Sequence, residues 1–224
     1  MNKIITTIII VLFSAVAYAQ KDVTKFLGIP VDGTKTEMKQ QLIAKGFKPV
    51  AGQEYLKGEF NGNDVRVYIG TNNNKVYRIM VCDENLLNEA DIIIRFNNLI
   101  SQFEKNERYF TITENERIKT DEDISYEMNI NNKRYEAAFY QSVDTTHMSD
   151  KIRDMILKKY NYTNEQFKSL EQEQKKKILD NAFSMTMDYL CKKTVWFMIS
   201  ETYGWYYITI YYDNNDNKAN GEDL

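Results

Sequence analysis

Short stretches of alternating apolar and polar residues, separated by Asn/Gly turns, are the feature that most restricts how this chain can fold. Val65, Val67 and Ile69 lie at every second position, which is the period of a half-buried β-strand. Asn61-Gly62 precedes them and favours a two-residue hairpin turn, because both residues accept a positive φ. A second alternating run follows the Asn-rich turn at 72–74. The pattern predicts antiparallel β-hairpins.

Amphipathic helices are predicted before and between these strands. Thr34 and Glu37 form a capping box ahead of Met38 and Leu42, so a short helix is expected to start there. A longer apolar stripe at helical spacing runs from 92 to 103. Strands and helices together predict an α+β fold, with antiparallel β-meanders or hairpins and amphipathic helices packed on one face.

The order of elements repeats along the chain, which predicts a single α+β body from 20 to 224 built of related units. The alternative is a division into two domains near 142–149. Residues 213–224 are rich in Asn and Asp and are predicted to form a polar tail. The predicted units share the order helix then strands and cover about 26–84, 86–141 and 149–212.

Three local predictions concern the second and third units. Tyr126–Ile130 and Tyr135–Phe139 alternate on either side of Asn131-Asn132, which predicts a hairpin. Thr163 and its partner Gln166 form a capping box that predicts the start of a long helix. A final hairpin is expected to turn at Tyr203-Gly204.

The first residues have the pattern of a secretory signal peptide. Lys3 supplies a positive charge, residues 4–16 are almost entirely apolar, and Ala17-Tyr18-Ala19 matches a cleavage site. An uncleaved anchor is the alternative, but this run is shorter than the roughly 18 residues that span a bilayer. No cysteine follows the run for lipid attachment. We therefore expect a signal peptide at 1–19 and an exported chain, periplasmic or extracellular, without a lipid anchor or a later membrane span.

The composition argues against several classes of function. The formal net charge is −3 and the pI is about 5.4, so the chain lacks the basic excess of a nucleic-acid-binding protein. The sequence has one histidine, His147, and no phosphate-binding loop, zinc-binding motif or nucleophile elbow. A loop histidine near Asp144 is more often solvated than catalytic. We expect no catalytic residue, no metal and no cofactor.

The two cysteines, Cys82 and Cys191, leave two interpretations open. Export would place them in an oxidising compartment, where a disulfide between them is permitted. They would otherwise be two separate thiols, because nothing in the sequence brings their Cα atoms within bridging distance.

The last predicted strand is aromatic on both of its faces. Tyr206, Ile208, Ile210 and Tyr212 form an ordinary core face. The opposite face is predicted to be a binding surface, because exposed aromatic rings anchor protein partners or stack on sugar rings. Cross-strand pairing that only stabilises the hairpin is the alternative. The predicted binding residues are Trp205, Tyr207 and Tyr211, with Trp196 on the neighbouring strand.

Two parts of the chain resemble known proteins. The segment Phe26-Leu27-Gly28-Ile29-Pro30-Val31-Asp32-Gly33-Thr34-Lys35, and the closing Tyr211-Tyr212-Asp213-Asn214 with Ala219-Asn220-Gly221-Glu222-Asp223-Leu224, resemble exported proteins of Bacteroidetes without an assigned activity. The order of a capped helix followed by a meander is also similar to β-lactamase-inhibitor-like and outer-membrane-assembly lipoprotein domains. These resemblances imply an exported bacterial protein with a binding fold and imply no activity.

Three classes of function are consistent with these observations. The favoured one is an exported, non-catalytic binding protein of the bacterial envelope, with a protein or glycan partner. The second is a carboxylate-dependent enzyme such as a glycan hydrolase, which requires two Asp/Glu groups about 5 to 10 Å apart in a cleft. The third is a self-associating structural protein.

Overall fold

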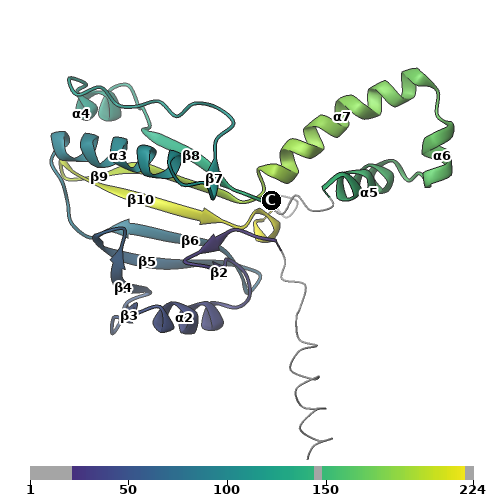
Figure 1. Cartoon of the computed structure of the whole chain (residues 1–224). Helices are drawn as coiled ribbons and strands as arrows, with labels where there is room; N and C mark the ends of the chain where they lie inside the picture. The colour runs from purple at the N-terminus through teal and green to yellow at the C-terminus, as the bar shows by residue number, and fades with distance from the viewer. Residues whose placement is uncertain (1–21, 144–147, 220–224) are drawn as a thin grey trace, which may run out of the picture.

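The chain forms one large antiparallel sheet with helices, as the computed structural model shows for residues 22–143 and 148–219 (Figure 1). The predicted α+β class is confirmed. The predicted signal peptide at 1–19 and His147 lie outside the described residues. The eight strands, in their order across the sheet, are β3 (Lys48–Pro49), β4 (Tyr55–Phe60), β5 (Asn63–Asn72), β6 (Lys75–Asp83), β10 (Trp205–Asp213), β9 (Thr194–Thr202), β8 (Glu136–Gln141) and β7 (Tyr109–Phe110).

The remaining elements precede, connect or follow these strands. A small hairpin of β1 and β2 lies ahead of the sheet. Their bounds, with those of the helices, are β1 (Lys25–Phe26), β2 (Ile29–Pro30), α2 (Lys35–Ala44), α3 (Glu89–Glu104), α4 (Ile124–Asn129), α5 (Met148–Tyr160), α6 (Asn164–Ser169), α7 (Gln172–Leu190) and the 3₁₀ turn η1 (Asn215–Asn217).

Two-residue turns with positive φ join the long strands, as the sequence predicts. The β4–β5 turn has φ of 54° at Asn61 and 73° at Gly62. The β9–β10 turn has φ of 51° at Tyr203 and 78° at Gly204. Asn73 and Asn74 make the equivalent turn between β5 and β6. Such turns match the twist of antiparallel strands, so these hairpins follow from local sequence.

The sheet consists of two related halves, which revises the prediction of three units. Each half is a helix followed by four strands, α2 with β3 to β6 and α3 with β7 to β10. β6 and β10 are neighbours at the centre of the sheet. From there to the edges, the strands follow in the order β6, β5, β4, β3 in the first half and β10, β9, β8, β7 in the second. Val81 of β6 pairs with Ile210 of β10 at this centre. The predicted second and third units are therefore one half, interrupted between β8 and β9.

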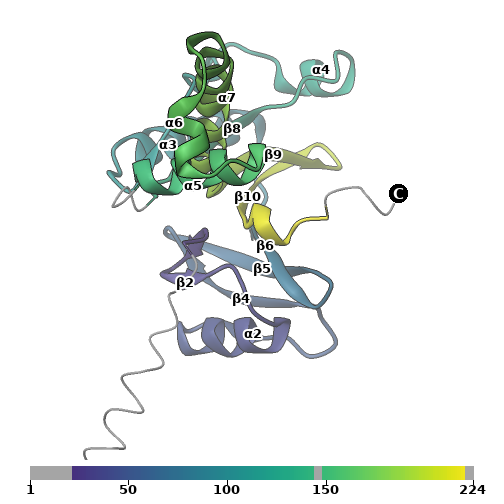
Figure 2. The same cartoon turned by 90° about the vertical axis from the view of Figure 1, so that its right-hand side faces the viewer.

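The helices α2 and α3 pack on one face of the sheet. In Figure 2 α2 lies beside β4 and β5 and α3 beside β8 and β9, and no described helix lies over β5, β6 and β10 on the opposite face. Every second strand residue, such as Val67, Phe139 and Ile208, joins Met38 of α2 and Phe96 of α3 in one apolar core. The Thr34–Glu37 capping box starts α2, as predicted. The side chain of Asn88 caps the start of α3.

The segment α5–α7, which we call the arm, interrupts the second half and projects from the sheet (Figure 1). Its apolar side chains form a separate cluster that includes Ile152, Ile156, Ile178 and Met185. The predicted long helix from Thr163 is wrong in one respect. It is broken at Leu170, whose φ of −62° and ψ of 146° are extended, and a new helix starts after Glu171.

The predicted hairpin around Asn131-Asn132 is wrong. Residues 124–129 form α4, because the Asp123 carboxylate accepts a hydrogen bond from the backbone N–H of Tyr126 and caps a helical turn. The other predicted strand is β8, but it pairs with β7 and β9. A short run with period two could not distinguish these outcomes.

The predicted polar tail is packed against the sheet as far as the structure describes it. Asp213 ends β10, and Asn214 and Asn217 are buried. The Asn214 side chain donates to the carbonyl of Val31, and the Asn217 side chain donates to that of Val76, at 2.7 and 2.8 Å. Buried amides with satisfied hydrogen bonds tie the C-terminal segment to the first half of the molecule.

Cys82 and Cys191 are both free thiols, so the disulfide interpretation is wrong for this structure. Cys82 lies in the same cross-strand row as Thr209 and Met198. Cys191 precedes Thr194, which is itself four residues along β9 from Met198, or about 13 Å. The start of β9 is therefore farther from the row of Cys82 than the roughly 7 Å between Cα atoms that a disulfide can bridge, and Cys191 precedes that start.

Candidate functional site

The face of the sheet opposite α2 and α3, which we call the open face, carries two adjacent rows of side chains. Strand register places residues of successive strands opposite one another, so each row crosses the sheet. The aromatic row is Tyr55, Tyr68, Met80, Tyr211 and Trp196, on β4, β5, β6, β10 and β9. The polar row is Lys57, Arg66, Cys82, Thr209, Met198 and Glu136, from β4 to β8.

The members of the aromatic row contact their neighbours and are half-buried. Trp196 and Tyr211 stack with ring centroids 4.0 Å apart and an interplanar angle of 12°. At the other end, the rings of Tyr55 and Tyr68 are 5.3 Å apart. Met80 lies between the two pairs in the register. Five adjacent strands therefore present large, partly accessible side chains along about 19 Å of the open face.

A buried ion pair holds the Trp196–Tyr211 end of this row in place. Arg78 donates from Nε and Nη2 to the two carboxylate oxygens of Asp213, at 2.6 and 2.8 Å. Trp196 donates from Nε1 to the same carboxylate at 3.1 Å, and Lys218 Nζ lies 2.9 Å from it. The Arg78 guanidinium is also 4.9 Å from the Tyr211 ring centroid. These contacts fix the orientation of both aromatic rings.

The protonation of Asp213 follows from its surroundings. Burial by itself raises the pKa of this carboxyl group, since the charged form loses hydration. Hydrogen bonds from Arg78, Lys218 and Trp196 outweigh burial, so the pKa is lowered overall. Asp213 is therefore an anion that holds the network together.

The structure separates the four aromatic residues that the sequence predicted as a binding surface. Trp196 and Tyr211 are directly paired and stacked, which is the cross-strand pairing that the alternative predicted. Tyr207 is half-buried on the same face of β10, four residues before Tyr211. Trp205 is 50% exposed, but it lies at the hairpin end about 20 Å from Tyr211 along β10.

Sequence reasoning missed Tyr55, Tyr68 and Met80. Each lies at the position in its own strand that faces away from the core, and this part of the signal was available from alternation. Their place beside Tyr211 depends on the pairing of β6 with β10, which are more than a hundred residues apart in sequence. No local pattern encodes that pairing.

Arg66 is a half-buried basic residue of the open face, whereas Lys48, opposite Lys57 on the edge strand β3, is exposed and also has no ion pair among the described residues. Lys57 pairs with Glu84, Arg78 with Asp213, and Arg134 with Glu136. Arg66 has no ion-pair partner among the described residues. Its Nε is buried without a hydrogen-bond partner, the one such side-chain atom in the part of the chain that the structure describes.

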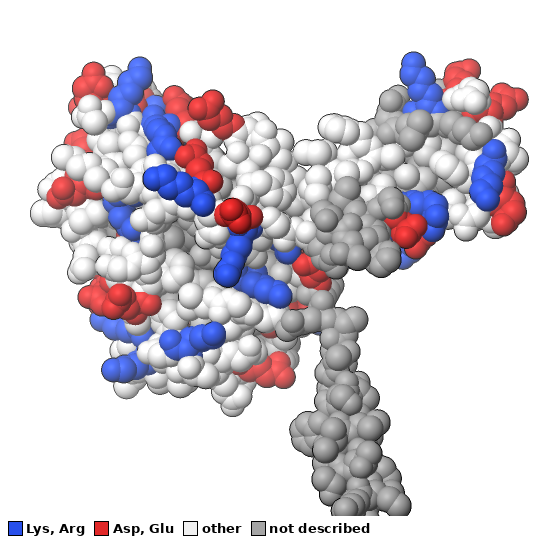
Figure 3. Space-filling model, viewed as in Figure 1, with Lys and Arg blue, Asp and Glu red and all other residues white. Residues whose placement is uncertain are grey.

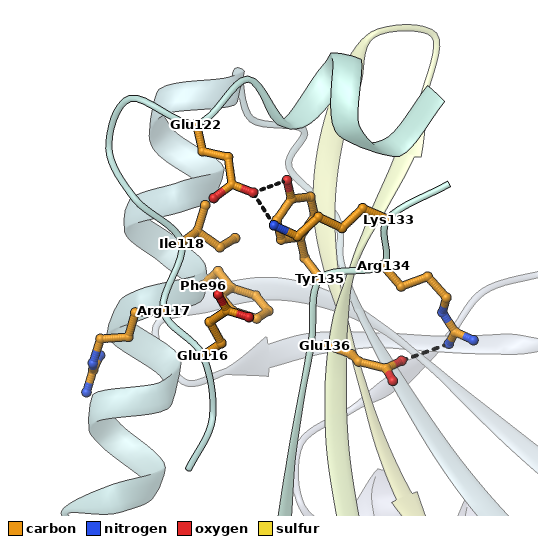
Figure 4. A pocket seen from close by; sticks show the side chains of 9 residues that line it. All are labelled: Phe96, Glu116, Arg117, Ile118, Glu122, Lys133, Arg134, Tyr135 and Glu136. Atoms are coloured by element: carbon orange, nitrogen blue, oxygen red, sulfur yellow. Dashed lines mark hydrogen bonds and ion pairs between the residues drawn. The ribbon is translucent and has the colours of Figure 1, made fainter. Parts of the chain in front are cut away.

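A small polar pocket lies beside Phe96 and Tyr135, and its lining extends to Arg134 and Glu136 of the open face (Figure 4). Tyr135 donates from its hydroxyl to Glu122 at 2.6 Å, and Lys133 pairs with the same carboxylate. These hydrogen bonds, from Lys133 first and then Tyr135, lower the pKa of Glu122. A hydrolase acid requires the opposite shift. Glu122 is therefore held as an anion and does not suit the role of a general acid.

A cleft between the two halves lies on the helix side of the sheet. Two connected hollows of about 740 and 1240 Å³ share Leu27, Phe60, Asn106, Tyr109 and Tyr212. Its floor is aromatic, and amides such as Asn61 and Gln102, which hydrogen bond to each other at 2.8 Å, cross its rim. On this side, acidic and basic residues intermingle over the body and the arm without a patch of one sign (Figure 3).

The part of the chain that the structure describes contains neither a cluster of metal ligands nor a membrane-spanning helix. Among residues 22–143 and 148–219, no three His, Cys, Asp or Glu side chains come together as metal ligands. In the same residues, no helix has the length and apolar character needed to cross a bilayer. Comparison with models of known protein families finds no match, and neither curated proteins nor solved structures match the chain.

Proposed function

We propose that this chain is an exported, non-catalytic binding protein of the bacterial envelope whose open face binds another protein. The aromatic row is the observation that carries the proposal, because five adjacent strands hold large, half-buried side chains on a face without a helix. Aromatic and Met side chains are enriched in the centres of protein interfaces. The pattern of residues 1–19 supports export.

The chemistry of the open face favours a protein partner over a glycan. Sugar hydroxyls are held by amides and carboxylates that donate and accept around an aromatic ring. The aromatic and polar rows contain no Asn or Gln, and the carboxylate of Glu136 is paired with Arg134. A surface about 19 Å long also exceeds the size of one sugar ring and suits a loop or strand of a protein.

Site-specific photo-crosslinking in the native envelope tests this proposal. A benzophenone amino acid replaces Tyr68 in the aromatic row or, as a control, Tyr126, which is 53% exposed on α4. We expect a discrete crosslinked protein from position 68 and none of the same mass from position 126. Excess unmodified protein should suppress this product, and excess Tyr211→Ala protein should not.

Three results would contradict the proposal. Equal crosslinking from both positions would mean that the open face has no special role. A product of twice the chain mass would indicate self-association in place of a different partner. A crosslink to glycan only would assign the face to a sugar.

A further inference from the structure

Arg66 is a cation on β5, next to the central β6–β10 pair of the open face, and its guanidinium has no described ion-pair partner. It lies in the polar row between Lys57 and Cys82, two residues from Tyr68 of the aromatic row. A guanidinium has five N–H donors, and a buried donor without a partner is unfavourable. Lys57, its neighbour across β4 and β5, is already paired with Glu84. The free donors of Arg66 therefore remain available to a group from outside the described chain.

The surroundings of Arg66 restrict the charge of that group. Glu59 and Asp64 lie opposite each other on the same two strands, and Glu84 directly follows the adjacent strand β6. Lys48, Lys57 and Arg66 lie among these three carboxylates, so this part of the face has no excess of positive charge for a phosphate, which carries nearly two negative charges. A carboxylate has one charge and matches a guanidinium with two parallel hydrogen bonds.

We infer that the protein bound by the open face places the carboxylate of an Asp or Glu side chain on Arg66, and apolar side chains on the adjacent aromatic row. This inference rests on the proposed function and adds the chemistry of the partner. Arg66 gives the interface its specificity, because the carboxylate must lie beside the apolar side chains in the partner.

Selection of peptides on the purified chain from residue 20 tests the inference. A phage library of random twelve-residue peptides is selected on the wild-type protein, and the enriched peptides are then synthesised. We expect them to share one Asp or Glu next to aromatic or aliphatic residues. Replacing that residue by Asn or Gln should weaken binding at least tenfold, as should Arg66→Gln in the protein.

Controls separate folding from binding. The Arg66→Gln protein should keep the wild-type circular dichroism and melting temperature, because no described partner of Arg66 is lost. Lys39→Gln removes an exposed basic residue of α2, on the other side of the sheet, and should change the affinity less than twofold. Tyr68→Ala should abolish binding of every enriched peptide.

The outcomes distinguish the inference from the proposed function. Peptides that depend on Tyr68 but bind equally well to Arg66→Gln would overturn the role of Arg66 and leave the open face as the binding site. Enrichment of peptides that are indifferent to Tyr68, or no enrichment at all, would overturn both.

Discussion

At the scale of single residues, Asp213 has the largest structural role on the open face. Its carboxylate is 1% exposed and joins Arg78, Lys218 and Trp196. The sequence places it in an Asn-rich segment, where it has the appearance of a solvated residue. The difference arises because its partners come from β6, β9 and the chain beyond η1, which only the folded sheet brings together.

Asp213 should make the stability of the protein depend on acid pH. Its pKa is lowered in the folded state, so its contribution is present above the unfolded pKa near 3.8 and is lost as the pH falls through the folded pKa. As the pH falls from about 5 to about 2, we expect the free energy of unfolding to decrease more steeply in the wild type than in Asp213→Asn. Urea denaturation across this pH range measures the difference.

Arg78→Gln provides the matched test at pH 7. It leaves the Asp213 carboxylate buried with fewer partners and should cost about 2 to 3 kcal/mol of stability. Parallel pH profiles of the wild type and Asp213→Asn, or a neutral effect of Arg78→Gln, would show that the ion pair is dispensable.

At the scale of elements, the arm is structurally independent of the sheet. Its apolar cluster shares no residue with the main core. The arm enters after β8 and leaves before β9, where the backbone N–H of Gln141 donates to the carbonyl of Lys193 at 2.9 Å. The equivalent connection in the first half is the two-residue Asn61-Gly62 turn. A short turn could therefore connect β8 to β9 in place of the arm.

Replacing residues 143–191 by Asn-Gly should leave the rest of the protein folded. Ser142 and Lys192 would then flank a two-residue turn in the position of the arm. We expect a free energy of unfolding within about 1 kcal/mol of the wild type, because few described contacts join the arm to the main core. Urea denaturation monitored by tryptophan fluorescence is the measurement, and a variant that aggregates or melts without cooperativity would contradict the separation.

At the scale of the whole molecule, the two halves share one core. The β6–β10 pair joins them at the centre of the sheet, with five residue pairs in register. Phe26 of the first half packs against Tyr212 of the second, with ring centroids 4.9 Å apart. An isolated half would expose the edge of β6 or β10 together with these apolar side chains.

The halves should therefore fold only together. Fragments 20–86 and 87–219 are expected to be largely unfolded alone and to combine into a one-to-one complex with the circular dichroism of the intact chain. Titration of one fragment with the other, followed by circular dichroism, tests this expectation. A cooperative melting transition in fragment 20–86 alone would identify it as an independent domain.

The sequence by itself determined the local features of this protein. The α+β class, the turns at Asn61-Gly62 and Tyr203-Gly204, the Thr34 cap and the core face of β10 all follow from φ preferences, capping and period-two patterns. These preferences act over a few residues, so they can be predicted without knowledge of the rest of the chain. They failed at 126–130, where a capped helical turn competed with an equally short strand pattern.

Only the tertiary structure decided which strands are neighbours. Alternation indicated that Tyr68 and Tyr211 point away from a core, but the pairing of β6 with β10 placed them in one row. The folded sheet also leaves Cys82 and Cys191 as free thiols, and leaves Arg66 Nε without a hydrogen-bond partner among the described residues. Strand order depends on contacts between residues far apart in sequence, whose combined packing energy selects one arrangement. The candidate binding surface is a product of that selection.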